Sequence, residues 1–344
     1  MSAIAPVAKN DDAAATPLPE KRLDWIPLAL VPVIALVALP FIPGLPTWVT
    51  LTVAGLATGM MIFIMASGLT LVFGLMDVLN FAHGVFISIG AYAAATVLIA
   101  MKNSLAATSL VANLAAVLAA ALAAMALAGV LGWFFERVVI KPVYGDHLKQ
   151  ILVTMGGLIV FEQLILVVWG PDIIPLPRSA ILTGALFFGD VAIERFRLVA
   201  VGVGAAVFIA MWVVLNRTRL GLLIRAGVEN AEMVESLGYR IQRLFIGVFV
   251  AGSALAGLGG AMWAMYQESV NAQMGLQVMV VIFIVVIIGG LGSVGGCFVG
   301  ALLVGLVANY AGFLAPKLAL GSNILLMMLI LLWRPRGLYP PGKA

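Results

Sequence analysis

Charged residues and cysteine are scarce in this chain of 344 residues. Only 10% of its residues are Asp, Glu, Lys or Arg, whereas about a quarter is usual in a soluble domain. The single cysteine, Cys297, has no partner for a disulfide within the chain and excludes a metal cluster held by cysteines alone. The chain therefore has no room for a large soluble domain with ordinary surface charge.

Motifs of nucleotide binding and catalysis are missing as well. The sequence contains no G-x-x-x-x-G-K-S/T loop, no G-x-S-x-G and no H-E-x-x-H. Neither of its two histidines, His83 and His147, has carboxylates or cysteines around it at metal-ligand spacing. We therefore expect no catalytic residues, no metal site and no cofactor in this chain. The basic pI near 9.3 indicates membrane topology rather than a nucleic-acid partner.

Apolar sequence is abundant, because 63% of the residues are hydrophobic. Runs of about 20 residues suit membrane-spanning α-helices, and the alternating segments of a β-barrel are absent from the sequence. The sequence therefore predicts an all-α, polytopic transmembrane helical bundle with about eight to ten spans. Two segments, 277–290 and 322–333, are short for full spans and suggest tilted pieces or half-helices. The apolar segments fall at roughly 26–42, 50–75, 81–101, 110–136, 151–170, 197–216, 244–266, 277–290, 296–315 and 322–333.

The distribution of positive charge predicts the topology. Ten spans with a cytoplasmic N-terminus place 14 of the 19 lysine and arginine residues on the cytoplasmic side, as is usual for membrane proteins. Both termini are then cytoplasmic. Residues 1–24 are polar and of mixed charge, which indicates a flexible tail, and residues 25–344 form the membrane domain. Two connections are long, the outer loop 171–196 and the cytoplasmic loop 217–243.

The cytoplasmic loop carries a short amphipathic pattern. Met233 and Leu237 are four residues apart, and Gly238 follows them as a residue suited to a helix C-terminus. Three glutamates recur at every third position, at Glu229, Glu232 and Glu235. The pattern predicts a short helix across the cytoplasmic face, which either docks into a groove on a partner or serves as a solvated connector.

Few polar groups lie inside the predicted spans. Glu162 is near the middle of its span, where a carboxylate is costly unless it faces a wet cavity or a partner. It therefore either lines a substrate path or makes a structural hydrogen bond to a neighbouring helix. Glu136 and Arg137 fall close to a helix end, where we expect them to be interfacial.

Small residues indicate close helix packing and helix breaks. Gly252, Ala256 and Gly260 have the small-xxx-small spacing that lets the backbones of two helices approach closely. Six glycines between positions 289 and 300 predict a break or a tight turn between two helices.

A second helix junction is expected in the stretch FGLMDVLNFAHG, residues 73–84, on the cytoplasmic side. Asp77 or Asn80 can cap the helix that follows. His83 falls in the first turn of that helix, where we expect it to be neutral and hydrogen-bonded. The alternative is that these side chains contact substrate. Asn80 and His83, together with Glu162, are therefore the candidates for residues of a substrate path.

Taken as a set, these motifs resemble the permeases of branched-chain amino-acid ABC importers of the LivH type. The resemblance extends over most of the chain from about residue 50. It is carried by GLMDVLNFAHGVFISIGAY (74–92), RAGVENAEMVESLGYRIQRLFIGVFVAGSALAGLGGAM (225–262), GGLGSVGGCFVGALLVG (289–305) and LLWRPRGLYP (331–340).

The resemblance implies a permease subunit of an ATP-binding cassette importer, which moves amino acids, branched-chain ones above all, across the bacterial inner membrane by alternating access. It also implies a related sister permease subunit, two cytoplasmic ATPase subunits and a periplasmic substrate-binding protein as partners. ATP hydrolysis would then occur on the ATPase subunits. The segment that couples to them, residues 225–239, would act through Arg225, Ala226, Glu229, Glu232, Met233, Leu237 and Gly238.

The resemblance leaves the substrate open, because similar permeases also serve other amino acids, urea, short amides and aromatic acids. The main alternative function is an ion-coupled secondary transporter of a small polar solute, with Glu162 or Asp77 as the proton or sodium group. That alternative predicts gradient-driven transport by this chain alone.

Overall fold

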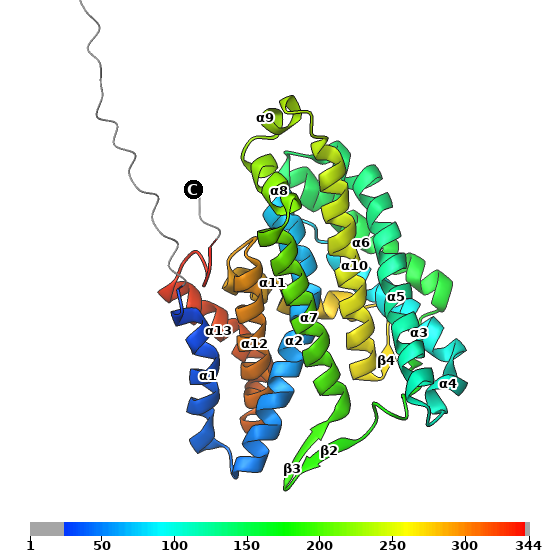
Figure 1. The fold of residues 1–344 in the computed structure, drawn as a ribbon, viewed down its shortest axis with the longest axis vertical. Coiled ribbons are helices and arrows are strands. Elements are labelled where there is room, and N and C mark those ends of the chain that lie inside the picture. Colours follow the sequence, from blue (N-terminus) through cyan, green and yellow to red (C-terminus); the bar gives the residue numbers. More distant parts are fainter. Residues whose placement is uncertain (1–23, 341–344) are drawn as a thin grey trace, which may run out of the picture.

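The computed structural model describes residues 24–340, so the predicted tail, apart from Asp24, lies outside the described residues. Long helices run side by side through the described part of the chain (Figure 1). The helices are α1 (Ile26–Ala38), α2 (Leu45–Met76), α3 (His83–Ala100), α4 (Lys102–Ala106), α5 (Leu110–Phe135), α6 (His147–Trp169), α7 (Arg195–Arg217), α8 (Arg219–Glu229), α9 (Ala231–Ser236), α10 (Ile241–Gln267), α11 (Met274–Gly289), α12 (Val294–Leu314) and α13 (Ala319–Trp333).

Within residues 24–340, seven helices are long and apolar enough to cross a membrane, namely α2, α3, α5, α6, α7, α10 and α12. The predicted all-α polytopic bundle is therefore confirmed. The segments expected to be short correspond to α11 and α13, each below span length. The first apolar segment is also short, because α1 passes into a 3-10 turn at Leu39–Phe41 that contains Pro40.

Within residues 24–340 the strands form two small pairs, and β1, β2 and β3 belong to the connection between α6 and α7. Strand β1 (Ile174–Pro175) pairs antiparallel with β4 (Ser269–Val270), directly after α10. Strands β2 (Ala185–Phe188) and β3 (Val191–Glu194) form a hairpin in which Ala185 lies opposite Glu194. This hairpin and α9 lie at opposite ends of the bundle (Figure 1), which we call the hairpin end and the α9 end.

The core of the bundle depends on close backbone contact between α2, α3 and α10. A Cβ atom placed on Gly260 of α10 would overlap the carbonyl oxygen of Ile87 in α3, and one on Gly68 of α2 would overlap that of Gly252. Ala256, between these two glycines of α10, is fully buried. The close approach predicted from the small-residue spacing is therefore confirmed.

Residues 334–340 fold back onto the end of α11. The N–H groups of Leu338 and Tyr339 donate to the carbonyl oxygens of Ile288 and Gly289, at 2.8 and 3.1 Å. Arg334 forms an ion pair with Asp24 at 2.6 Å, which lowers the pKa of that carboxyl group. The segment therefore connects the entry to α1 with the junction between α11 and α12.

A single added methyl group tests the backbone contact between α3 and α10. Gly260→Ala should destabilise the protein by about 1–3 kcal/mol, because its Cβ overlaps a carbonyl oxygen that cannot easily move. Gly247→Ala, on an open face of the same helix, should be neutral or slightly stabilising, because alanine favours a helix over glycine. Thermal unfolding of the purified protein in detergent measures both. Equal melting temperatures for the two variants would contradict the proposed role of this contact.

Candidate functional site

The α9 end contains an interruption between α2 and α3. Helix α2 ends at Met76, and Asp77 takes a left-handed backbone conformation with φ +53° while its N–H bonds to the carbonyl of Phe73. Helix α3 begins at His83, so residues 77–82 form a non-helical link between two buried helices. The predicted break at this junction is confirmed.

Two buried side chains of α6 satisfy the backbone of this link. The side-chain oxygen of Gln150 accepts from the N–H of Leu79 at 3.4 Å, and the hydroxyl of Thr154 accepts from the N–H of Phe81 at 3.2 Å. A broken backbone at membrane depth needs such partners, because lipid supplies none. The sequence analysis missed both residues; their signal is an amide and a hydroxyl four positions apart, which places them on one face of a helix.

Helix capping by Asp77 or Asn80 is wrong. The first turn of α3 receives no side-chain cap among the described residues. Asp77 ends α2 instead, and its largely exposed carboxylate lies 3.5 Å from Nε2 of His147. Asn80 is buried, and neither polar atom of its amide has a hydrogen-bond partner within residues 24–340.

His83 lies in the first turn of α3, as expected, and is buried. Its Nε2 is 2.9 Å from the carbonyl oxygen of Met65 in α2. Because a carbonyl oxygen only accepts, His83 donates the hydrogen bond through Nε2. A Cβ atom on Gly68 would also lie 3.0 Å from Cε1 of this ring, in addition to its overlap with the carbonyl of Gly252. His83 therefore joins α2 to the start of α3.

Glu162 is half-buried on α6 and lines a small pocket. The pocket lies between α6 and the first turns of α3 and α11, and Gly84, Ser88 and Leu276 also line it. The structure thus brings Glu162 next to the start of α3, directly after His83. Asn80 and His83 themselves do not line this pocket.

The loop of residues 217–243 forms two short helices rather than one. Helix α8 ends at Glu229, and α9 begins after Asn230, whose side-chain oxygen accepts from the N–H of Met233 at 2.9 Å. This N-cap separates Glu229 from Glu232, so the single acidic helix expected there is wrong. Arg225 and Ala226 belong to α8, whereas Glu232 and Met233 belong to α9.

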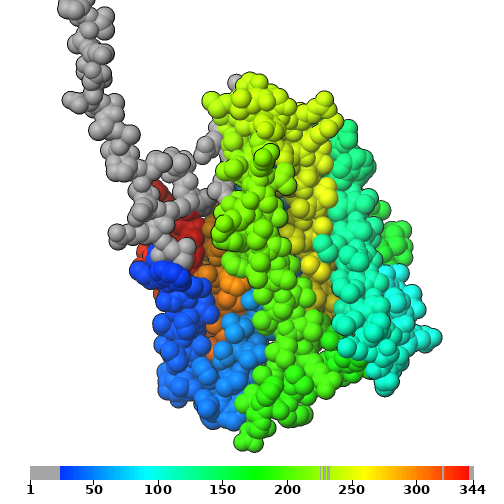
Figure 2. Space-filling view, in the orientation of Figure 1, coloured from blue at the N-terminus to red at the C-terminus, as the bar shows by residue number. Residues whose placement is uncertain are grey.

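Gly238 ends α9 as predicted. It has φ +87°, and the N–H groups of Gly238 and Tyr239 donate to the carbonyls of Glu235 and Val234 in a Schellman arrangement. Met233 and Leu237 are 61% and 70% exposed, so the apolar pair has no partner within the described chain. The space-filling view shows this region at one extremity of the molecule (Figure 2).

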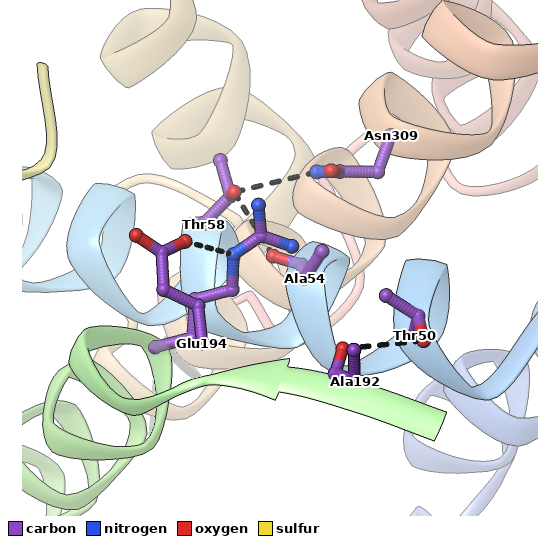
Figure 3. Close-up of polar contacts among 7 residues, drawn as sticks. Thr50, Ala54, Thr58, Ala192, Glu194 and Asn309 are labelled. Carbon is purple, nitrogen blue, oxygen red and sulfur yellow. Dashed lines mark hydrogen bonds and ion pairs between the residues drawn. The ribbon is translucent and has the colours of Figure 1, made fainter. Parts of the chain in front are cut away.

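The hairpin end carries polar contacts that join neighbouring elements (Figure 3). The amide of Asn309 in α12 donates to the hydroxyl of Thr58 in α2 at 3.3 Å. The hydroxyl of Thr50 donates to the carbonyl of Ala192 in β3 at 3.4 Å, and Glu194 pairs with Arg197 at 3.0 Å. Each side chain here has a partner, which indicates a structural role.

Together, the apolar helices of span length and the satisfied helix break define a multi-pass membrane protein. The chain belongs to the family described as branched-chain amino acid transport system / permease component, whose family model matches residues 51–333.

Individual relatives agree with this family. The chain is 26% identical over 291 residues to the high-affinity branched-chain amino acid transport system permease protein LivH of Salmonella typhimurium. The aligned residues cover 83% of this chain and 92% of that protein. It is 28% identical over 300 residues to the corresponding protein BraD of Pseudomonas aeruginosa, 83% and 94% of the two chains. The nucleoside ABC transporter permease protein NupC of Lactococcus lactis matches over 127 residues at 29% identity, 37% and 36% of the two chains. No solved structure matches the chain.

A conservative pair of substitutions tests the support that α6 gives to the helix break. Thr154→Val should lower the free energy of unfolding by about 1–3 kcal/mol, because the buried N–H of Phe81 loses its acceptor. Thr154→Ser keeps the hydroxyl and should lose less. Thermal unfolding and the uptake rate of the assembled transporter provide the measurements. If both variants behaved alike, the hydroxyl would have no role in holding the link.

Proposed function

We propose that this chain is the permease subunit of an ATP-driven importer that carries branched-chain amino acids across the bacterial inner membrane. The observation that carries the proposal is the match to the permease family over residues 51–333, together with relatives that align over more than nine-tenths of their length. The seven apolar helices of span length are consistent with it. ATP hydrolysis takes place on separate subunits.

The partners are a sister permease subunit, two cytoplasmic ATPase subunits and a periplasmic substrate-binding protein. The docking surface for an ATPase is α9 with the end of α8. Its features support this role, because Met233 and Leu237 are exposed next to a capped, well-defined helix end at Gly238. Apolar anchors on a short helix suit insertion into a groove.

The substrate path runs along α6 and the start of α3. Glu162 faces this path, with Asn80 and His83 beside the broken junction that shapes its α9 end. Three features support the assignment: Glu162 lines a pocket with the first turn of α3, Asn80 has an unpaired buried amide, and the junction is irregular backbone. Irregular backbone at membrane depth occurs where it is buried in protein or lines a cavity.

The rival function is ion-coupled secondary transport, and the family match favours the importer. Reconstitution into liposomes separates the two. The importer requires ATP, the ATPase subunits and the binding protein for leucine uptake. Gradient-driven uptake by the purified single chain would overturn the proposed function.

The docking surface is tested by placing charge on its apolar anchors. The double variant Met233→Asp, Leu237→Asp should reduce ATP-driven uptake at least about tenfold. A few anchor residues supply most of the binding energy of an interface, and this variant removes two of them. ATPase subunits should co-purify less with this variant. Leu318→Asp, equally exposed beyond the far end of α12, is the matched control and should retain both properties. Normal coupling in the double variant would place the ATPase contact elsewhere.

The substrate path is tested at its carboxylate. Glu162→Gln should reduce uptake by about tenfold or more, because a charge-assisted hydrogen bond to the substrate is lost. Glu162→Asp retains the charge and should recover part of the rate. Uptake is measured with saturating binding protein, and co-purification of the ATPase subunits controls for assembly. A structural hydrogen bond would instead show as equal loss of stability without a selective loss of uptake.

A further inference from the structure

A second pocket lies at the α9 end, where the end of α5, α9 and the start of α10 meet. Its volume is about 660 Å³, within the range of about 300–1,000 Å³ that is usual for small-molecule sites. Glu136 from the end of α5, Glu235 from α9 and Arg243 from α10 all line it. The pocket therefore joins the proposed docking segment to the body of the bundle.

Glu136 is the unusual residue of this pocket. It was expected to be interfacial, but it is only 2% exposed and begins a π-helical turn, Glu136–Ile140, at the end of α5. Such turns are rare and frequently mark functional sites. One carboxylate oxygen accepts from the hydroxyl of Tyr144 at 2.7 Å, and burial with this hydrogen bond raises the pKa of Tyr144. The other oxygen, Oε2, has no partner within residues 24–340.

A buried carboxylate oxygen without a partner is costly, and a ligand that donates to it removes the cost. The lining offers complementary groups around it. Lys141 and Arg243 supply positive charge suited to a carboxylate, and Ile241, Phe245 and Ile246 supply an apolar wall. One small molecule uses all three features: it has an ammonium group, a carboxylate group and an aliphatic side chain.

We propose that this pocket binds a free α-amino acid with an aliphatic side chain from the cytoplasm, and that the bound amino acid slows ATP-driven transport. The ammonium group pairs with the carboxylate of Glu136, the carboxylate of the ligand pairs with Lys141 and Arg243, and its side chain packs on the apolar wall. Because Glu235 of α9 belongs to the same lining, the ligand contacts both the docking segment and the bundle. It therefore stabilises one placement of α9 over others, which is how a ligand shifts a conformational equilibrium.

The choice of an aliphatic amino acid as ligand rests on the proposed function, in which the transported substrate is itself a branched-chain amino acid. Binding at this pocket then depends on the cytoplasmic concentration of the transported substrate. The location of the site does not depend on it. Transport that stops when product accumulates requires a sensor on the cytoplasmic side, and the pocket lies at the end that carries α9.

The experiment uses the assembled transporter in nanodiscs, with its ATPase subunits and without the binding protein. Labelled L-leucine should bind and should lower the ATPase rate. Glu136→Gln should weaken binding at least about tenfold and remove the inhibition, because a charge-assisted hydrogen bond is lost. Asp146→Asn is the matched control, since Asp146 does not line the pocket and asparagine caps α6 equally well. Inhibition is scored for each variant as the ratio of its rates with and without leucine.

Analogues of leucine test the site without changing the protein. N-acetylleucine lacks the ammonium group and should bind wild-type transporter at least about tenfold more weakly than leucine. Equal binding of leucine and N-acetylleucine, or undiminished leucine binding to Glu136→Gln, would overturn the proposal.

Two further outcomes distinguish this proposal from a contact with the ATPase subunit and from an error in the proposed substrate. If wild type does not bind leucine and Glu136→Gln loses its ATPase subunits, the pocket receives a cationic side chain of the ATPase and the proposal is wrong. Failure of leucine uptake with the binding protein overturns the proposed substrate instead. Binding is measured without that protein, so the two failures are distinguishable.

Discussion

Close contact between the backbones of α2, α3 and α10 is the constraint on which the rest of the structure depends. Lipid is as apolar as a helix surface, so helices in a membrane gain little from hiding apolar side chains and associate instead through close packing. Glycine supplies this packing at Gly68, Gly252 and Gly260. The hydrogen bond from His83 to Met65 forms because α2 and α3 are held this near each other. A separate close backbone contact, between Gly74 of α2 and Gly292 in the α11–α12 link, joins the two helix junctions.

Groups from distant parts of the chain satisfy the irregular backbone of the α2–α3 link and the end of α11. Gln150 and Thr154 bond the link between α2 and α3, whereas residues 334–340 bond the end of α11. The π-helical turn that carries Glu136 belongs to the α9 end. The proposed docking segment, α9 with the end of α8, lies at the same end of the bundle (Figure 1).

Local signals in the sequence predicted the helices, the break at 77–82 and the cap at Gly238, because apolar runs and glycines act through the residues next to them. Other features depend on residues far apart in the chain. Thr154 reads as an ordinary polar residue until the fold brings Phe81 to it, and Asn230 divides a helix that periodicity alone joins. Glu136 looked interfacial because its burial comes from tertiary packing around the end of α5. The residues of the proposed substrate path have the same dependence, because the pocket beside Glu162 is lined by helices distant in sequence.

The ion pair between Arg334 and Asp24 can form only late in the synthesis of the chain, because its two residues lie far apart in the sequence. A ribosome delivers α1 to the membrane long before residues 334–340 exist. Until those residues leave the ribosome, Asp24 has no guanidinium partner, and the end of α11 lacks the N–H donors of Leu338 and Tyr339. Helix α1 therefore lies in the membrane without this contact until residues 334–340 have been synthesised and reach Asp24.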